Sequence, residues 1–413
     1  MTPRLLVTVN GPGELMGWAR PFVRAVYRLD PSARITLVFV PCPYASGREP
    51  DAAQRLFPNA AVVSPKRYAR FLMGRATEGM ERGAGALQYL GGDLYHANTI
   101  AKRLGLVPMT YKFSKRHFAH SFARFFAVDE LNAAQLRATN APADRVRVVG
   151  NLVADAVLES LREPAPPPGQ GQTLCIFPGS RPPELKALLP FLLDTALRVM
   201  RARPGLRGSV VISPFSTDEE IRASLVKPDP AFGGVRGELS ADGRTIAAEG
   251  MQVDVDRSGS YEALAQAALV IATPGTKCIE AAVLGKPLLV IAPLNSLDEI
   301  VLPGMAGYLH RVPLVGRPLK RWVARKIERR FKYMAQPNID AGKPLVPELR
   351  GVLRAEDIAA HAQAMLANPQ ALHAQGVELA KLYARDVGAA TKMAREALDV
   401  ASDAMGAAAG AAS

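Results

Sequence analysis

The strongest constraint on the fold is an alternation of short β-rich runs with amphipathic helical segments. It starts with RLLVTVN at 4–10, followed by a Gly- and Pro-rich loop and then WARPFVRAVYRL, whose apolar residues recur at helical spacing. The same unit returns several times, up to RVRVVG at 145–150. Strands that alternate with helices pair in parallel, so this part of the chain is predicted to be a doubly wound α/β domain.

A proline-rich segment separates this pattern from a second copy of it. LREPAPPPGQGQT at 161–173 disfavours helix and sheet, because consecutive prolines lack the backbone N–H and the glycines add freedom. The alternation restarts with TLCIF at 173–177 and continues to PLLVIA at 287–292. The segment at 161–173 is therefore predicted to link two α/β domains.

These boundaries predict three parts of the chain. We expect a Rossmann-like domain at 1–160, a second at 173–353, and helices at 354–405, where the pattern is helical and rich in Ala. Two doubly wound domains followed by helices match the GT-B architecture, an α/β fold whose ligands lie at the carboxyl ends of the strands. Many chemistries use such sheets, so the fold class by itself assigns no function.

The charge of the chain favours anionic partners. Its 413 residues include 51 Lys and Arg against 38 Asp and Glu, a formal net charge of +13. Phosphorylated substrates, nucleic acid and acidic membrane surfaces all fit that charge. The sequence contains no helix-turn-helix, RNA-binding sheet motif or zinc module, so no nucleic-acid partner is expected.

The cysteines and the hydropathy pattern indicate a cytoplasmic protein. Cys42, Cys175 and Cys278 are widely spaced, which predicts neither disulfides nor a zinc site. The first apolar run is shorter than a signal-peptide core, and no uncharged stretch approaches the roughly 18 to 20 residues that span a bilayer. Any membrane contact is expected to be peripheral, on the inner face of the cell membrane.

The segment after TLCIF has the residues of a phosphate-binding turn. Gly179 lets backbone amides approach an anion, the Ser180 hydroxyl can donate a hydrogen bond, and Arg181 offers a planar fork that matches diphosphate oxygens. A plain strand-to-helix turn with a solvated arginine explains the same residues equally well.

A second unit of the same kind follows in ALVIATPGTKCIEAAVLGKPLLVI. Gly275 permits close approach, Thr276 is expected to cap the helix, and this helix start is expected to face the same sheet edge as the turn at Arg181. Glu280, one turn into the helix, either binds ribose hydroxyls or complements the helix dipole. Two anion-binding helix starts would then share one edge.

Four segments together resemble lipid A disaccharide synthases. They are FPGSRPPELKALLPFLL, ATPGTKCIEAAVLGKP, QPNIDAGKPLVPEL and, before the linker, VVGNLVADAV. The resemblance runs from Gly13 to the helix near Leu366. It implies a UDP-sugar site in the second domain, with Gly179, Ser180 and Arg181 near the diphosphate. It also implies that the nucleotide and sugar are surrounded by Gly275, Thr276, Glu280, Asn338 and Glu348.

For Asn338 and Glu348 the residues alone support another interpretation. Asn and Glu near turns commonly cap loops through side-chain hydrogen bonds to the backbone. The spacing of QPNIDAGKPLVPEL is what connects them to the family's nucleotide site.

The first loop departs from the family pattern. GPGELMGW keeps Gly13, Glu14 and Gly17, but Met16 and Trp18 stand where the family has Ser and Asp. The resemblance implies that the N-terminal domain binds the acceptor, and a loop at the end of the first strand would face it. Glu14 either binds or deprotonates an acceptor hydroxyl, or it only complements a helix dipole.

Asp93, in LQYLGGDLYHANTIAKRLGLVP, is the leading candidate for the catalytic base. It follows a predicted strand and precedes a helix, where the family has an aspartate with that role. A base must take the proton of the attacking hydroxyl while the nucleotide leaves as a stabilised anion. Asp93 equally fits a helix N-cap. His96, His117 and His120 are not accompanied by other metal-ligating residues at a suitable spacing, so no metal site is expected.

Three basic segments with aromatic residues are candidates for contact with an anionic membrane. They are PKRYARFLMGR at 65–75, YKFSKRHFAHSFARFF at 111–126 and PLKRWVARKIERRFKYM at 318–334. Aromatic side chains would enter the lipid and cations would meet its headgroups. Ordinary helices with a solvated basic face have the same composition.

The resemblance implies an inverting, metal-independent hexosyltransferase without cofactors. It would move an acylated, glucosamine-type sugar from a UDP-sugar to a lipid-linked or phosphorylated sugar, as in lipid A synthesis. The lone Asp-x-Asp match, at 254–256, fits a strand rather than a metal-binding loop. A UDP-sugar 2-epimerase on the same fold is the alternative.

Overall fold

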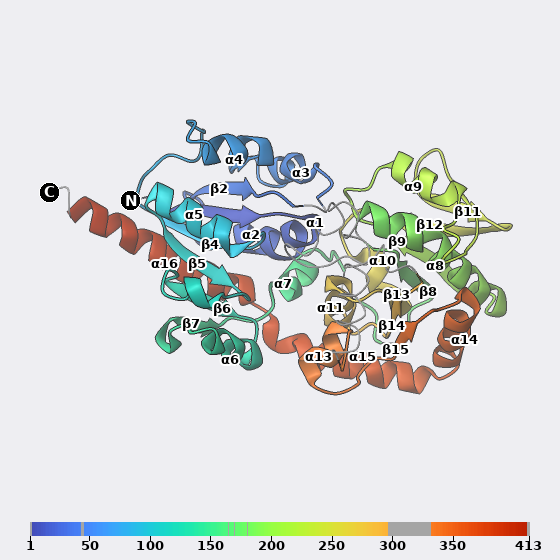
Figure 1. Cartoon of the computed structure of the whole chain (residues 1–413). Coiled ribbons are helices and arrows are strands. Elements are labelled where there is room, and N and C mark those ends of the chain that lie inside the picture. The colour runs from blue at the N-terminus through green and yellow to red at the C-terminus, as the bar shows by residue number, and fades with distance from the viewer. Residues whose placement is uncertain are drawn as a thin grey trace. The chain divides into compact units, whose positions relative to one another are not determined.

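The chain folds into two compact units. In the computed structural model, the first unit is Met1–Glu159 with Asp386–Ser413, and the second is Ser160–Arg385. Figure 1 shows the elements of both. The structure describes residues 2–42, 45–163, 165–168, 170–179, 181–295 and 332–410.

The first unit contains a parallel sheet of seven strands in the order β3-β2-β1-β4-β5-β6-β7. The strands are β1 (Arg4–Val9), β2 (Arg34–Phe39), β3 (Ala61–Val63), β4 (Ala86–Tyr89), β5 (Val107–Tyr111), β6 (Arg124–Ala127) and β7 (Val146–Val148). The order reverses between β1 and β4. In doubly wound sheets ligands bind at such a switch point, beyond the carboxyl ends of the strands.

Helices cover both faces of this sheet (Figure 1). The helices α4, α5 and α6 pack on one face, and α2, α7 and α16 contact one another on the other. The α-helices are α1 (Pro12–Glu14), α2 (Arg20–Leu29), α3 (Glu49–Leu56), α4 (Pro65–Leu72), α5 (Leu94–Leu104), α6 (Glu130–Ala138), α7 (Leu152–Leu158) and α16 (Ala389–Gly410), and short 3-10 turns lie at Arg116–Phe118 and Ala143–Arg145.

The segment predicted as the first loop is helical. Gly11 is the N-cap of α1, Pro12 occupies its first position, and a π-helical stretch, Leu15–Ala19, joins α1 to α2. Proline suits a helix start because its missing N–H would have no partner there. The loop expectation for GPGELMGW is therefore wrong, and Gly13, Glu14 and Gly17 lie on a helix. Single π-helical turns often occur at functional sites.

The second unit contains an eight-stranded sheet in the order β10-β11-β12-β9-β8-β13-β14-β15. The strands from β12 to β15 pair in parallel, and β10 and β11 add an antiparallel edge. They are β8 (Thr173–Phe177), β9 (Arg207–Val211), β10 (Glu238–Leu239), β11 (Thr245–Ala248), β12 (Met251–Asp256), β13 (Ala267–Ala272), β14 (Leu288–Pro293) and β15 (Glu348–Gly351). This sheet has its switch point between β8 and β13.

The helices of the second unit also form two layers. The core on one face is built from α8, α9 and α14, whereas α11 contacts α13 and α15. The helices are α8 (Pro182–Ala202), α9 (Asp218–Val226), α10 (Glu262–Ala265), α11 (Thr276–Val283), α13 (Gln336–Ala341), α14 (Ala355–Leu366) and α15 (Pro369–Tyr383). The Asp-x-Asp match at 254–256 lies in β12, as expected.

The last helix, α16, is part of the first unit. Its buried residues include Met393, Ala397 and Val400, which recur at helical spacing on one face. The buried carboxylate of Asp155, in α7, accepts hydrogen bonds from the backbone N–H groups of Gly388 (2.7 Å) and Ala390 (2.6 Å). These bonds satisfy N–H groups that the start of a helix leaves open, and they fix α16 to the first unit.

The proline-rich segment is held on the second unit. The fully buried Lys286 donates a hydrogen bond from its Nζ to the carbonyl oxygen of Pro166 at 2.8 Å. Burial lowers the pKa of Lys286 to about 8. A Cβ added to Gly376 would lie 2.4 Å from the Cβ of Pro168, so this packing requires glycine. The segment therefore has defined contacts.

None of the helices in the described ranges combines the length and the apolar character needed to cross a bilayer.

Candidate functional site

The switch point of the second unit brings the two predicted anion-binding turns together. Strands β8 and β13 are neighbours, and the last residue of β8, Phe177, is in register with the last residue of β13, Ala272. The turns at 178–181 and 273–275 therefore leave the same edge of the sheet, as the sequence predicted. This edge is the candidate donor site.

The turn after β8 is shaped by Gly179. This residue has a φ of +98°, and an added Cβ would lie 2.5 Å from the Cβ of Glu184. Arg181 is the N-cap residue of α8, and its guanidinium donates to Glu184 Oε1 at 3.1 Å. Ser180 lies outside the described residues. The turn thus presents a partly exposed arginine whose charge is balanced by a carboxylate on the same helix.

The turn after β13 ends in Gly275, the N-cap of α11. Its φ is +153°, and an added Cβ would meet no atom of the described residues within 4 Å. Thr276 is the first residue of α11, and no side chain caps this helix. The expectation that Thr276 caps the helix is wrong. An N-cap residue directly precedes the helix, whereas Thr276 is already its first residue and Gly275 is the N-cap. The described part of the chain thus leaves the backbone at Gly275 uncovered on this side.

Glu280 forms an ion pair that the sequence analysis did not identify. Its carboxylate, only 6% exposed, accepts a hydrogen bond from Lys277 Nζ at 2.7 Å. The ammonium of Lys277 also lies 5.6 Å from the ring centroid of Phe177 and 5.8 Å from that of Tyr261. Both distances are typical of cation–π contacts. The sequence feature that could have identified Lys277 is its position directly after Thr276, at the start of a predicted helix.

Asn338 and Glu348 form a buried clasp between α13 and β15. The amide of Asn338 accepts from the N–H groups of Leu345 and Val346 and donates to the carbonyl of Val346 and to Glu348 Oε1, at 2.7–2.9 Å. Asn has two donor hydrogens and two acceptor positions, so this amide is fully used. The loop-capping interpretation is what the structure shows for Asn338.

The other partners of Glu348 are backbone N–H groups and Arg350. Met334 and Ala335 donate from their N–H groups at 2.9–3.1 Å, and Arg350 Nε donates at 2.9 Å. Burial raises the pKa of Glu348, but these hydrogen bonds outweigh it and the pKa is lowered overall. Glu348 is therefore a fixed anion with many donors around it.

The clasp lies close to the donor edge. In the sheet register Ala272, Val290 and Glu348 stand side by side on β13, β14 and β15. Burial raises the pKa of the Cys278 thiol, in α11, to about 12, and the charges of Glu280 and Glu348 contribute to the rise. The structure thus places Gly179, Arg181, Gly275, Thr276, Glu280, Asn338 and Glu348 around one end of one sheet.

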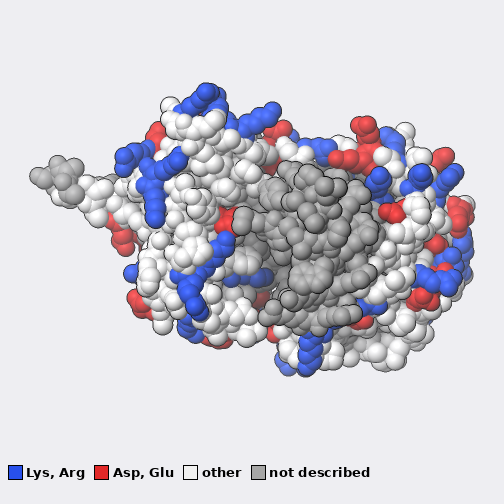
Figure 2. Space-filling model, viewed as in Figure 1, with Lys and Arg blue, Asp and Glu red and all other residues white. Residues whose placement is uncertain are grey.

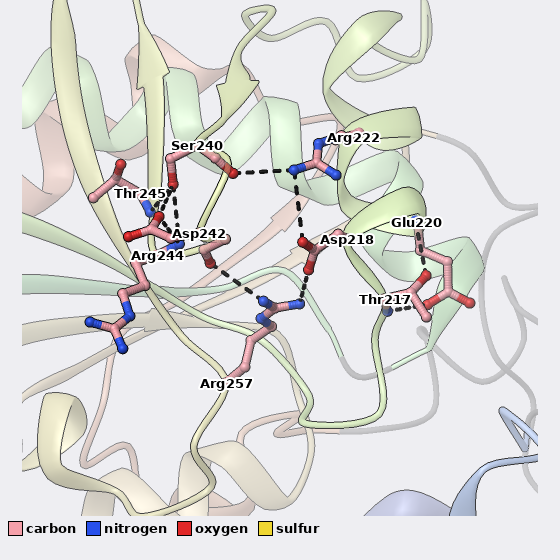
Figure 3. Close-up of polar contacts among 10 residues, drawn as sticks. Thr217, Asp218, Glu220, Arg222, Ser240, Asp242, Arg244, Thr245 and Arg257 are labelled. Carbon is pink, nitrogen blue, oxygen red and sulfur yellow. Dashed lines mark hydrogen bonds and ion pairs between the residues drawn. The ribbon is translucent and has the colours of Figure 1, made fainter.

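A separate polar network fixes the neighbouring end of the sheet (Figure 3). Arg257, which follows β12, and Arg222 both pair with Asp218 at the start of α9. Thr217 and Glu220 form a capping box there, each accepting from the other's backbone N–H. These contacts join the loop after β9 to the end of β12, which indicates a structural role.

The switch point of the first unit brings Glu14 and Asp93 to one edge. A Cβ added to Gly91, after β4, would lie 3.3 Å from the Cβ of Glu14, so the two segments approach closely. Burial raises the pKa of Tyr89, at the end of β4, and the charges of Glu14 and Asp93 raise it further. The Tyr89 hydroxyl donates to the carbonyl oxygen of Gly92 at 2.7 Å. Both candidate bases therefore lie near Tyr89.

Asp93 has two partners in the structure. It is the N-cap of α5, accepting from the Tyr95 N–H at 2.9 Å, and Lys115 Nζ donates to both of its oxygens at 2.8 and 2.7 Å. Burial raises the pKa of Asp93, but the hydrogen bonds from Lys115 and Tyr95 lower it more, so the net change is downward. The N-cap interpretation is confirmed. Lys115 had been noted only as part of a basic segment.

Aromatic side chains surround this edge. Trp18 packs edge-on against Tyr111, with ring centroids 5.6 Å apart, and lies 6.4 Å from Phe113. Gly17, one residue earlier, is buried, and an added Cβ would be in ordinary contact with Val153. Trp18, which stands where the resemblance implies an aspartate, thus adds an apolar ring beside the candidate acceptor edge.

Two histidines of the first unit, His96 and His117, have structural contacts. The Tyr68 hydroxyl lies 2.9 Å from Nδ1 of His96. Burial lowers the pKa of His96, and the charge of Asp93 only partly offsets this. The His117 ring packs against that of Phe118 in a tilted arrangement, with ring centroids 4.2 Å apart. No cluster of three or more metal-ligating side chains occurs in the part of the chain that the structure describes.

Most aromatic residues of the two described basic segments belong to the core. Tyr68 and Phe71 in α4 are buried, and so are Phe122, Phe125 and Phe126. They cannot enter a membrane without unfolding the unit. The third segment, 318–334, lies almost entirely outside the described residues.

Comparison with curated proteins gives a consistent set of relatives. Lipid-A-disaccharide synthase from Pseudomonas aeruginosa is 29% identical over 209 residues, 49% of this chain and 44% of that protein. The synthase from Anaeromyxobacter dehalogenans is 29% identical over 236 residues, 56% of this chain and 50% of that protein. The chain is similar to lipid-A-disaccharide synthases. The resemblance is thereby confirmed, and the chain spans about half the length of the synthases it matches. No family model matches the sequence.

Solved structures share the fold. UDP-GlcNAc 2-epimerase from Neisseria meningitidis, solved with UDP-GlcNAc bound, matches with a TM-score of 0.56 and 12% identity, covering 96% of this chain and 100% of that one. Another UDP-N-acetylglucosamine 2-epimerase matches with a TM-score of 0.54 and 14% identity, covering 96% of each chain. Identities this low show the fold alone. The GT-B class with two Rossmann-like domains is confirmed.

We expect Asn338→Ala to destabilise the second unit by about 2–4 kcal/mol, because it leaves several buried backbone groups without partners. The measurement is the midpoint of unfolding in urea, monitored by fluorescence. The control is Asn368→Ala, which removes only the N-cap of α15 and should cost about 1 kcal/mol. Equal losses in the two variants would contradict the clasp.

Proposed function

We propose that the chain is a glycosyltransferase that transfers a glucosamine-type sugar from a UDP-sugar to a lipid-linked or phosphorylated sugar. The observation that carries the proposal is the shared edge of β8 and β13, where two helix starts and two cations adjoin. The similarity to lipid-A-disaccharide synthases supports the reaction class. The acceptor is proposed by chemical class only.

In the proposed donor site the diphosphate lies between the turns at 178–181 and 273–275. Arg181 and the first N–H groups of α11 would bind phosphate oxygens, since helix starts carry partial positive charge. Because α8 begins with Pro182 and Pro183, which have no N–H, its start would contribute Arg181 and its dipole. At Gly275 no described residue occupies the space that a side chain would otherwise fill. Glu280 would accept hydrogen bonds from ribose hydroxyls. The clasp of Asn338 and Glu348 would hold the neighbouring loop.

In the proposed reaction an acceptor hydroxyl attacks the anomeric carbon, the bond to UDP breaks, and the configuration inverts. Asp93 or Glu14 would take the proton of that hydroxyl, and UDP would leave as an anion stabilised by the donor site. Both carboxylates lie near Tyr89 at the edge of the first sheet. The donor-site cations make a metal ion unnecessary in this proposal.

The decisive experiment is calorimetric titration of UDP into the protein and two variants. We expect UDP to bind and Arg181→Ala to weaken it roughly tenfold or more, because a charge-assisted contact is lost. The matched control is Arg198→Ala on the same helix, whose guanidinium pairs with Asp194 on the surface. Absence of UDP binding by the unmodified protein would refute the proposal.

Product analysis then separates the transferase from the alternative epimerase. A UDP-sugar incubated without acceptor should remain unchanged, whereas an epimerase would invert its C2 centre. With membrane extract, a labelled sugar should appear in a new product even in the presence of EDTA. The epimerase fold neighbours make this comparison necessary, although they are evidence of fold only.

If Asp93 is the base, Lys115→Met should change the pH dependence of transfer. Lys115 holds the pKa of Asp93 down, so its removal raises that pKa. The acid limb of kcat/KM should then move to higher pH by about one unit. Lys102→Met, on the exposed side of α5, is the control. If the acid limb of kcat/KM does not move and Glu14→Gln abolishes activity, the catalytic base is Glu14.

We also propose a peripheral contact between the first unit and anionic lipid. Tyr95 and Phe113 are 62% and 45% exposed, and both belong to the segments around Asp93. Lys115 and Arg116 follow Phe113 by two and three residues, and Lys115 donates to Asp93, which lies two residues before Tyr95. Figure 2 shows further Lys and Arg side chains over α4 and α5. Exposed rings among cations suit a lipid headgroup region.

Vesicle sedimentation tests this contact. We expect binding to phosphatidylglycerol-containing vesicles to exceed binding to phosphatidylcholine alone, and the pair of changes Tyr95→Ser and Phe113→Ser to weaken it roughly tenfold. Leu131→Ser, an equally exposed apolar residue on α6, is the control. Equal binding by all variants would contradict the assignment of these two rings.

A further inference from the structure

The donor edge contains a buried carboxylate that depends on one cation. Glu280 is 6% exposed and pairs with Lys277 on the same helix, three residues earlier. An unpaired charge in such a position is strongly unfavourable, because its hydration is lost without compensation. Lys277 is the charged partner that this buried carboxylate has in the structure.

Three segments of the second unit position the ammonium of Lys277. The first turn of α11 carries it, Phe177 at the end of β8 lies on one side, and Tyr261 before α10 contributes the other ring. Tyr261 has a φ of +64°, a conformation that a non-glycine residue adopts only when its surroundings require it. The side chain of Lys277 is 32% exposed, so a ligand can reach the cation more readily than the carboxylate behind it.

We infer that Lys277 is a diphosphate-binding residue, and that nucleotide binding exchanges its ion pair with Glu280 for two contacts to the ligand. The ammonium donates to phosphate oxygens, and the Glu280 carboxylate accepts from ribose hydroxyls. Each charged group thus keeps a partner. The inference rests on the proposed UDP site, and it adds a residue that the sequence motifs had not assigned to ligand binding.

Space and charge at this edge agree with the exchange. Among the described residues, none has an atom within 4 Å of a Cβ added at Gly275, two residues before Lys277, so they leave room for a phosphate beside the ammonium. Arg181 across the edge has the same arrangement, a cation paired with a carboxylate three residues later. Both turns therefore carry cations whose charge is balanced before a ligand binds.

The exchange predicts a strong preference for nucleotides with phosphate. Uridine would have to separate Lys277 from Glu280 with no anion for the lysine, whereas UDP supplies partners for both groups. The quantity that reports the exchange is the ratio of the uridine dissociation constant to the UDP dissociation constant. A merely structural lysine would change both constants together.

The test measures UDP, UMP and uridine binding by calorimetry for the unmodified protein and for Lys277→Met. We expect the ratio to fall on the order of 10- to 100-fold in the variant, because UDP loses a charge-assisted contact and uridine does not. Lys227→Met, an exposed lysine at the end of α9, is the matched control and should leave the ratio unchanged.

A second pair of variants covers the case in which Lys277→Met fails to fold. Glu280→Gln and the double variant Lys277→Met with Glu280→Gln contain no unpaired buried carboxylate, and they differ only in the lysine. The ratio of the uridine to the UDP dissociation constant must also be lower in the double variant than in Glu280→Gln. An unchanged ratio while the unmodified protein binds UDP overturns the role of Lys277 alone. If the unmodified protein binds no UDP, the proposed function fails too.

Discussion

The parallel pairing of β8 with β13 is the constraint on which the rest of the molecule's chemistry depends. Because Phe177 and Ala272 end their strands in register, two turns and two helix starts open on one side of the sheet. The first sheet has the same reversal of strand order between β1 and β4, which brings Glu14 close to the segment that carries Asp93. Each unit thus concentrates its polar residues where its own strand order changes direction.

A second regularity is that the charged groups at these edges are already neutralised within the chain. Arg181 pairs with Glu184, Lys277 with Glu280, and Lys115 with Asp93. Buried or half-buried charges need such partners when no ligand is present. An anionic ligand would then compete with a carboxylate for each cation, which ties affinity to the ligand's own charge. Asn338 differs, because its hydrogen bonds are made to the backbone of the loop it closes and to Glu348 of β15.

The sequence was sufficient for the parts of this structure that depend on local pattern. The alternation of strands and helices predicted both sheets, and the two Gly turns were correctly placed at one edge. The sequence-based prediction was wrong about where two helices begin. Thr276 follows the N-cap instead of forming it, and GPGELMGW, expected to be a loop, is helical from Pro12. The partners of Lys277 and Glu348, and the return of α16 to the first unit, depend on contacts between distant segments that no local pattern contains.

The most direct test of the central claim is a crystal structure of the protein in complex with UDP. The account predicts that the diphosphate lies between the turn at Arg181 and the start of α11 at Gly275, with the ribose at Glu280. A nucleotide bound away from the carboxyl ends of β8 and β13 would contradict it.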